Sequence, residues 1–311
     1  MTARVSVAIA TYNGEKYLSE QLDSILIQTH TVDEVIVVDD CSSDDTQAIL
    51  SQYVSSYPQI KVVQNQSNLG VVKTFEKALL YCTNEFILLC DQDDVWLENK
   101  VEVLLNSIGN NLLIHSDAQL VDGNLQLIAI SLSAKNKDVT RSSFVELLLT
   151  NQVTGCTVMI RKELLKFALP MPDDTYMHDY HLTLVAAYFK RIGYVNHALT
   201  KYRQHGKNVV GTIAPDYFSW KEKQRVENIE SLMNMPLFVN NLDVKYAIQY
   251  RHSIYFNKFP RVGLICWVFR NFGVKRLIGF IFRASLGDRV GSWFFMLRKN
   301  KLKLEQSVSQ L

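Results

Sequence analysis

Three carboxylates stand within four positions in the stretch "LLCDQDDVWLENK", which covers residues 88–100. Asp91, Asp93 and Asp94 follow directly on an apolar run. Like charges this close repel one another unless they face water or surround a cation. An Asp-x-Asp pair at the end of a buried strand therefore predicts a site for a hard divalent cation, Mg²⁺ or Mn²⁺, which takes other ligands from substrate phosphates. The alternative is that Asp93 and Asp94 only cap a helix beginning near Val95.

The hydrophobic pattern around these acids alternates between strands and helices. Runs of β-branched residues predict the strands, and apolar residues at helical spacing predict the helices between them. The expected strands cover residues 4–10, 34–40, 60–65 and 85–91, and the expected helices cover 14–28, 43–57 and 69–82. Such alternation indicates an α/β protein with a mainly parallel sheet flanked by helices. Beyond it we expect strands at 112–117 and within 199–208, and helices at 141–151 and 177–191.

Polar residues follow each of the first four expected strands. In a parallel sheet the ligand crevice lies beyond the carboxyl ends of the strands, so these side chains should meet there. They are Thr11, Tyr12 and Asn13, then Asp39 and Asp40, then Asn65 to Asn68, and finally Asp91, Gln92 and Asp93. Acids placed like Asp39 and Asp40 can hydrogen-bond a ribose or a base, or can simply cap a helix. The chain has neither a GxGxxG nor a GxxxxGK[ST] pattern, which argues against dinucleotide and P-loop sites.

The composition is that of an ordinary soluble globular protein, with 48% hydrophobic and 21% charged residues in a chain of 311. A formal net charge of +2 gives no general affinity for polyanions. The five cysteines show no CxxC spacing, which favours reduced thiols and a cytoplasmic location. The first apolar run is too short for a signal peptide, and no run reaches the roughly 18 residues that cross a membrane.

Basic charge gathers late in the chain. Residues 258–303 hold eleven Lys or Arg and one acid, Asp288. Within 260–298, apolar and aromatic clusters alternate with single cations, a pattern typical of helices that lie on an anionic membrane. We therefore expect residues 260–300 to bind an anionic membrane surface. The alternatives are a helical subdomain packed on the core and a protein interface. Nucleic-acid binding is not expected, because the aromatic residues cluster with aliphatic ones.

Several blocks of the sequence together resemble a known family. "SVAIATYNGEKYLSEQLDSILIQT", "EVIVVDDCSSDDT", "NLG" and "CDQDD" are similar to the nucleotide-sugar domain of family 2 glycosyltransferases, which have the GT-A (Rossmann-like) fold. "MHDYHL" and "YRQHGKN" resemble the rhamnosyltransferase-like subgroup of bacterial surface-polysaccharide pathways. The resemblance covers roughly residues 4–210. It implies a catalytic domain over residues 1–210, and leaves 211–311 as a helical, basic and amphipathic extension.

The resemblance also implies roles for individual residues. The nucleotide-sugar pocket would be lined by Thr11, Tyr12, Asn13, Asp39, Asp40, Asn68, Asp91 and Gln92. The metal would be held by Asp91, Asp93 and His205, and the acceptor side would include Gly155, Cys156 and His178. Asp179 would be the catalytic base, and its place at a helix start favours the ionised form. Many relatives carry Glu where this chain has His178, a departure that leaves the environment of the base open.

The implied activity is an inverting, metal-dependent transfer of a sugar from a dTDP- or UDP-sugar to a glycan acceptor. The acceptor is expected to be lipid-linked, and rhamnose is one sugar that the subgroup suggests. The enzyme would act in polysaccharide, O-antigen or capsule synthesis, as a peripheral protein on the cytoplasmic face of the inner membrane. Two other functions stay open, a nucleotidyltransferase and a non-catalytic adaptor with the same fold. A metal site made of His178, His181, His205 and Asp179 is a further alternative.

Overall fold

A computed structural model describes residues 3–132, 139–205, 229–255, 263–273 and 277 of the chain. The chain divides into two compact units, Met1–Ala214 and Pro215–Leu311. The first unit contains every residue that the sequence singled out for chemistry. The sequence also predicts a linker near 208–216. That segment lies outside the described residues, as does most of the expected membrane-binding region 260–300.

The first unit is built around a sheet of nine strands. Four neighbours in the order β3-β2-β1-β4 are parallel. They are β1 (Val5–Thr11), β2 (Glu34–Asp39), β3 (Ile60–Gln64) and β4 (Phe86–Cys90). Their carboxyl ends therefore lie at one edge of the sheet, which we call the carboxyl edge.

The other half of the sheet is mixed in direction. β8 (Val158–Arg161) runs antiparallel between β4 and β6 (Leu113–Val121), and β9 (Ile192–Arg203) runs parallel to β6. Two short strands, β5 (Val95–Trp96) and β7 (Leu127–Ala129), pair antiparallel with β9 and β6. Because β8 is reversed relative to both of its neighbours, β6 and β9 point the same way as β1.

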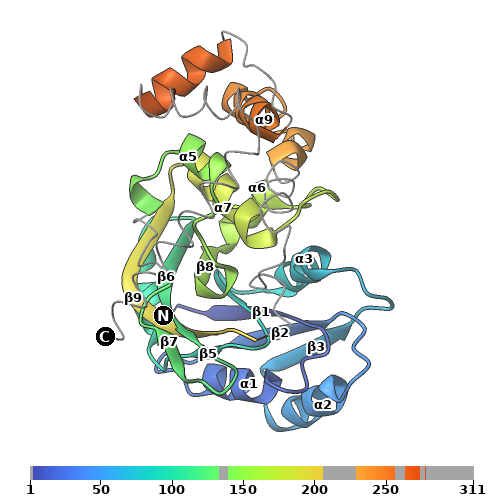
Figure 1. Cartoon of the computed structure of the whole chain (residues 1–311). Coiled ribbons are helices and arrows are strands. Elements are labelled where there is room, and N and C mark those ends of the chain that lie inside the picture. The colour runs from blue at the N-terminus through green and yellow to red at the C-terminus, as the bar shows by residue number, and fades with distance from the viewer. Residues whose placement is uncertain (1–2, 133–138, 206–228, 256–262, 274–276, 278–311) are drawn as a thin grey trace, which may run out of the picture. The chain divides into compact units, whose positions relative to one another are not determined.

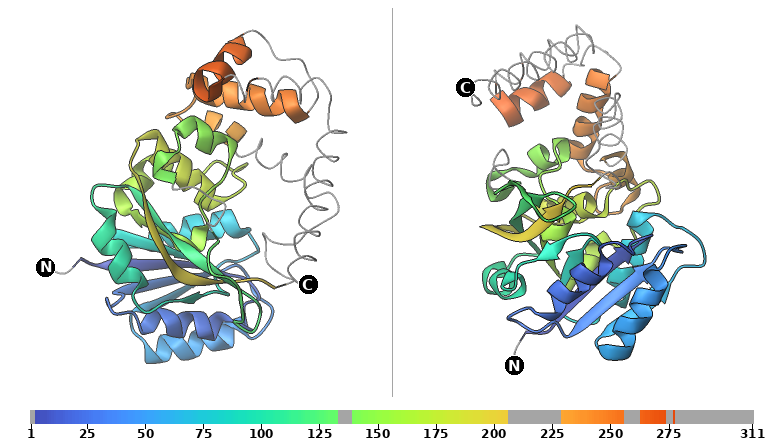
Figure 2. Two further views of the ribbon diagram at one scale, coloured as in Figure 1. Left: turned by 60° about the vertical axis from the view of Figure 1, so that its left-hand side comes forward. Right: turned by 60° about the horizontal axis from the view of Figure 1, so that its bottom comes forward.

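Helices cover both faces of the sheet, as the alternating pattern predicts (Figure 1). α1 (Leu18–Leu26), α2 (Thr46–Ser56) and α4 (Lys100–Ile108) share a core with alternate residues of β1, namely Val5, Val7 and Ile9. In both views of Figure 2 the blue helices α1 and α2 lie side by side on this face. The opposite face carries α3 (Val71–Tyr81), which contacts β1, β2 and α7 (His178–Tyr188). Two short helices, α5 (Phe144–Leu149) and α6 (Leu165–Ala168), pack on α7.

The chain differs from the expected elements just after the acids. The helix expected near Val95 begins only at Lys100, because Val95 and Trp96 form β5 with Lys201 and Thr200 of β9. Asp93 and Asp94 therefore do not cap that helix. β9 is also longer than expected, since it begins at Ile192 to pair with β6.

The start of α2 shows a smaller difference. The helix begins at Thr46, three residues later than expected. The backbone N–H of Ser43 instead donates to Asn13 Oδ1 at 2.9 Å, which ties the end of β2 to the end of β1.

The second unit is helical where it is described. α9 (Leu242–Tyr255) and a helical segment at 263–273 are joined by Trp267, whose indole N–H donates to Asp243 Oδ1 at 2.9 Å. The ring of Trp267 also stacks on Tyr246, with centroids 5.9 Å apart. In the part of the chain that the structure describes, no helix has the length and apolarity to cross a membrane.

Candidate active site

Gln92 joins the loop after β4 to the end of β1. Its Oε1 accepts hydrogen bonds from Thr11 Oγ1 at 2.6 Å and from the Tyr12 N–H at 2.9 Å, and its Nε2 donates to the Tyr12 carbonyl at 3.0 Å. Gly14 leaves room for this contact, because a Cβ at 14 would lie 2.5 Å from Gln92 Oε1. The ring of Tyr12 is about half exposed, at 47%, and is free to stack on a planar ligand.

The two acids at the end of β2, Asp39 and Asp40, are buried and hold loops in place. The Asp39 carboxylate accepts from the hydroxyl of Ser42 at 2.5 Å and from its N–H at 3.0 Å. The Asp40 carboxylate accepts from the N–H groups of Leu69 and Gly70 at 2.8 and 2.9 Å. Asp40 thus shapes the loop that precedes α3, at the carboxyl edge where a nucleotide is expected.

Two asparagines predicted for the same pocket also lie in these loops. Asn13 has a positive φ of 49°, and its side chain accepts from Ser43 as described above. Asn68 is exposed, and its Oδ1 accepts from the Gly70 N–H at 3.2 Å. The structure therefore brings the predicted nucleotide-pocket residues to one edge of the sheet.

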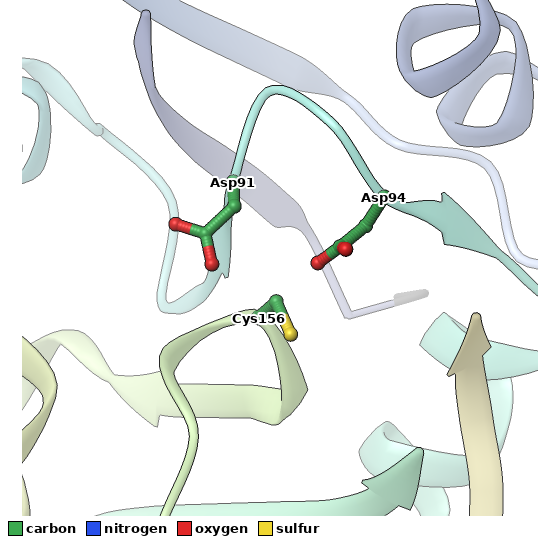
Figure 3. A group of neighbouring side chains, drawn as sticks. All are labelled: Asp91, Asp94 and Cys156. Atoms are coloured by element: carbon green, nitrogen blue, oxygen red, sulfur yellow. The ribbon is translucent and has the colours of Figure 1, made fainter. Parts of the chain in front are cut away.

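Two acids of the loop after β4 converge with a thiol. One carboxylate oxygen from Asp91, one from Asp94 and the Sγ of Cys156 all lie within 4.8 Å of one another. Figure 3 shows the three side chains next to one another, with the two acids on the loop after β4 and Cys156 on the turn before β8. Asp94 Oδ2 is buried and has no hydrogen-bond partner among the described residues. The Cys156 thiol acts on the same carboxylate but is only a weak donor, so a stronger donor or a cation would stabilise this oxygen.

The electrostatics of the loop point the same way. Burial raises the pKa of Asp91 well above its usual range, and the charges of Asp94, Asp93 and Asp179 raise it further. Burial, followed by the charge of Asp93, raises the pKa of Asp94 to about 7. These carboxylates repel one another as long as no cation lies between them.

One buried cation already lies beneath the acids. Lys100, the first residue of α4, donates from Nζ to the Cys156 carbonyl at 2.6 Å and to Thr200 Oγ1 at 2.9 Å. The same Nζ lies 3.9 Å from the ring centroid of Trp96, which is buried in the core and not available to stack on a sugar. Burial lowers the pKa of Lys100 to about 8. A single ammonium does not balance three carboxylates, but an added divalent cation would.

His205 meets the acid loop from the end of β9. Its Nε2 lies 2.8 Å from Asp93 Oδ2, and its ring centroid lies 5.0 Å from that of Tyr17. The structure therefore brings together His205 and Asp93, two of the three predicted metal ligands, while Asp91 faces Asp94 and Cys156.

Asp179 is held by backbone hydrogen bonds in the first turn of α7. Its Oδ2 accepts from the Gly155 N–H at 2.9 Å, and its Oδ1 accepts from the Tyr180 N–H at 2.6 Å. Burial raises its pKa to about 6, although these two hydrogen bonds act in the opposite direction. The helix start alone predicted an ionised, weak base, whereas burial makes the carboxylate more basic.

His178 lies beside the same glycine. A Cβ at position 155 would lie 3.3 Å from His178 Nε2 and 3.5 Å from Asp179 Oδ2. The imidazole stacks on Phe75 with centroids 3.8 Å apart, and burial lowers its pKa to about 3, so the ring is neutral. Neither ring nitrogen has a hydrogen-bond partner among the described residues.

The structure also shows where the other histidines and Cys156 lie. His178 and His181 are buried on α7, where His181 Nε2 lies 2.9 Å from the Ala168 carbonyl, and the structure does not gather them with His205. Cys156, expected on the acceptor side, lies against Asp91 and Asp94. Sequence reasoning missed Lys100 and Arg203, because a single Lys or Arg carries no motif of its own.

Comparison with known proteins decides the family. The family model described as Glycosyl transferase family 2 matches residues 6–167, just over half of the chain. The chain belongs to glycosyl transferase family 2. It is therefore a glycosyltransferase, and the nucleotidyltransferase and adaptor alternatives are set aside.

Relatives of this family 2 enzyme include glycosyltransferases of bacterial surface-glycan synthesis. An uncharacterized glycosyltransferase of Nostoc sp. is 26% identical over 325 aligned positions, which span 98% of both chains. The UDP-Glc:alpha-D-GlcNAc-diphosphoundecaprenol beta-1,3-glucosyltransferase WfgD of Escherichia coli is 29% identical over 58% of this chain and 68% of that protein. The dTDP-rhamnosyl transferase RfbG of Shigella flexneri is 30% identical over 65% and 73%.

Solved structures confirm the GT-A fold. TarS of S. aureus, in complex with UDP-GlcNAc, superposes with a TM-score of 0.59 at 22% identity, over 89% of this chain and 81% of that one. A mannosyltransferase of Pyrobaculum calidifontis, in complex with GDP-Man and Mn²⁺, superposes with a TM-score of 0.56 at 18% identity, over 95% and 84%.

Proposed function

We propose that this glycosyltransferase moves one sugar, with inversion, from a nucleoside-diphosphate sugar to a hydroxyl of a bacterial surface-glycan acceptor. Asp179 is the base, and a divalent cation is held by the loop after β4. The observation that carries the proposal is the separation of two kinds of carboxylate at the carboxyl edge. Asp91, Asp93 and Asp94 form one crowded group, while Asp179 is held alone by backbone N–H groups.

The acid loop fits a hard divalent cation. Its donors are carboxylate oxygens and one imidazole, which suit Mg²⁺ or Mn²⁺. Asp94 Oδ2 is buried without a partner, and three carboxylates exceed the charge of Lys100. Asp91, Asp93 and His205 would hold the ion as the sequence predicts, and Asp94 is an added candidate. The ion supplies positive charge for the diphosphate that leaves.

The chain's own residues supply the remaining chemistry. Asp179 accepts the proton of the acceptor hydroxyl as that oxygen bonds to the anomeric carbon and the bond to the diphosphate breaks. The N–H groups of Gly155 and Tyr180 fix both oxygens of this carboxylate, which orients it before substrate arrives. Raised basicity suits the role, because a base with a pKa near the working pH is both ionised and able to take a proton.

The nucleoside would occupy the edge between β1 and β2. The half-exposed ring of Tyr12 offers a stacking surface, and the loop that Asp40 fixes forms the opposite wall. UDP- and dTDP-sugars are the first donors to test, since WfgD and RfbG act with these nucleotides. Rhamnose remains one candidate sugar.

A lipid-linked acceptor is proposed because WfgD acts on a diphosphoundecaprenol-linked sugar. Such an acceptor would keep the enzyme at the cytoplasmic membrane face, with the basic residues 260–300 on an anionic surface. Truncation after residue 259 should release the protein from phosphatidylglycerol vesicles at low salt. Equal vesicle binding by the truncated chain would remove the membrane role.

Nucleotide release tests the activity itself. The full chain is incubated with UDP-glucose, UDP-GlcNAc, GDP-mannose and dTDP-rhamnose, each with and without a polyprenyl-diphosphate-linked sugar, and with Mn²⁺ or EDTA. We expect acceptor-dependent release of UDP or dTDP with Mn²⁺ and none with EDTA. Full nucleotide release in EDTA would contradict the proposed metal. Nucleotide release that is equal with and without the acceptor would contradict the proposed acceptor class.

A further inference from the structure

Arg203 is a buried cation that joins three separate segments at the carboxyl edge. The residue ends β9 and is 1% exposed. Its Nε donates to the Asp93 carbonyl at 2.7 Å, and its Nη1 donates to the Gly123 carbonyl at 2.8 Å. Its Nη2 pairs with the carboxylate of Glu20 on α1. The acid loop, the turn between β6 and β7, and α1 are thus fixed to one guanidinium.

The backbone of the same residue holds the second acid. The Arg203 N–H donates to Asp94 Oδ1 at 2.9 Å, and one oxygen of the same carboxylate lies within 4.8 Å of a carboxylate oxygen of Asp91 and of the Cys156 Sγ. The Arg203 side chain therefore holds the main chain of Asp93, and the Arg203 backbone N–H holds the carboxylate of Asp94.

The contacts of Arg203 also place His205. One residue separates them along the chain, and both contact the ring of Tyr17. The guanidinium carbon lies 4.2 Å from the Tyr17 centroid, and the imidazole centroid lies 5.0 Å from it. His205 Nε2 then reaches Asp93 Oδ2 at 2.8 Å. Asp93 and His205 are consequently held in place by contacts with the same two residues, Arg203 and Tyr17.

The guanidinium of Arg203 donates to a main-chain oxygen of the acid loop and also forms an ion pair with Glu20 of α1. The planar guanidinium carries five N–H donors on three nitrogens, whereas the three donors of a lysine all lie on one nitrogen and cannot reproduce this geometry.

We propose that Arg203 is a positioning residue for the divalent-cation site, which presets the geometry of Asp93, Asp94 and His205 before the ion binds. This inference rests on the proposed metal dependence. Residues that orient metal ligands typically change metal affinity about 10- to 100-fold when they are replaced.

Arg203→Lys tests the proposal, with Arg161→Lys as the matched control. Arg161 also joins a carbonyl and a carboxylate, those of Gly109 and Glu85, but the pair lies at the opposite edge of the sheet. Mn²⁺ affinity of the full chain is measured by the electron paramagnetic resonance of free Mn²⁺ in the presence of UDP or dTDP. Thermal unfolding is measured in EDTA.

We expect R203K to bind Mn²⁺ about tenfold or more weakly than wild type, while R161K binds it normally. Excess Mn²⁺ should restore most of the turnover of R203K. A variant R203K with wild-type Mn²⁺ affinity would overturn the inference, as would an equal loss of affinity in R161K. If wild type itself binds no Mn²⁺, the proposed metal dependence fails together with the inference.

Glu20→Gln provides a second variant if R203K does not fold. Glu20 is about half exposed, so its replacement leaves the core intact but removes the ion pair of Arg203. We expect a smaller loss of Mn²⁺ affinity in E20Q, several-fold rather than tenfold. Unchanged affinity in a folded E20Q, together with an unfolded R203K, would mean that Arg203 serves stability alone.

Discussion

The backbone N–H of Gly155 donates a 2.9 Å hydrogen bond to Oδ2 of Asp179. This contact fixes the carboxylate of the proposed base against the turn that precedes β8. Position 155 has little room for a side chain, because a Cβ would lie 3.3 Å from both Asp179 Cβ and His178 Nε2. The base is therefore oriented by the fold and does not depend on substrate to order it.

The first prediction concerns the proton that the base removes. In Asp179→Asn the single amide oxygen can replace only one of the two carboxylate oxygens that accept backbone hydrogen bonds. The amide cannot accept a proton at neutral pH. We expect turnover to fall about 10²-fold or more, with donor binding nearly unchanged. Donor affinity is measured by calorimetry and turnover by nucleotide release. Asp173→Asn, at an almost fully exposed acid, is the control and should be normal. Normal turnover in D179N would remove Asp179 from the mechanism.

The second prediction concerns the pH profile of turnover. Burial raises the pKa of Asp179 to about 6, so the base is protonated below that pH. With saturating metal and donor, turnover should fall about tenfold per pH unit below 6. A lower limb near pH 4, the usual range of an exposed carboxylate, would show that the base is not buried during the reaction.

The third prediction concerns stability, which the same burial lowers. The folded pKa of Asp179 lies above its ordinary value of 3.8, so the native state holds the proton more tightly than the unfolded state does. Ionisation thus costs stability as pH rises from about 4 to 6, and the full cost remains above 6. The free energy of unfolding of Asp179→Asn, measured by urea denaturation at pH 8, should therefore exceed that of wild type by about 1–3 kcal/mol. No such gain is expected at pH 4. An inactive variant that is also less stable at pH 8 would speak for a structural carboxylate.

The fourth prediction separates the ligands of the ion from the neighbours of the site. Cys156 lies beside Asp91 and Asp94, but a thiol is a poor ligand for Mg²⁺ or Mn²⁺. Cys156→Ser should bind Mn²⁺ within a few-fold of wild type, whereas Asp93→Ala and His205→Ala should each lose about tenfold or more. Loss of Mn²⁺ binding in C156S comparable to that of D93A would make Cys156 a ligand.

Much of the nucleotide half of the fold could be predicted from local pattern. The β-branched strands and amphipathic helices up to Cys90 alternate in the order expected, since buried parallel strands need apolar side chains on both faces. The meeting of Thr11, Asp39 and Asp91 at one edge follows from that topology alone. The pattern of residues 155–169 predicts a strand followed by a helix, but not that the strand, β8, runs antiparallel to its neighbours, because direction in a sheet is set by pairing with β4 and β6.

The site was less accessible to sequence reasoning than the fold. The acids after β4 were visible as a motif, but their support was not. Trp96 was expected in a helix but belongs to β5, and Lys100, the first residue of α4, reaches the Cys156 carbonyl with its Nζ. Arg203 contacts the main chain of Asp93, which lies 110 positions earlier in the chain. Such a distant contact produces no local sequence pattern. The basicity of Asp179 depends on burial, which residue order does not reveal.

The central claim is that the loop carrying Asp91, Asp93 and Asp94 seats the cation that meets the departing diphosphate. Anomalous diffraction from crystals grown with Mn²⁺ and UDP or dTDP tests it most directly. We predict one strong manganese peak in contact with this loop and His205, bridged to the diphosphate oxygens. Ordered nucleotide at the carboxyl edge with no manganese peak beside these carboxylates would contradict the account.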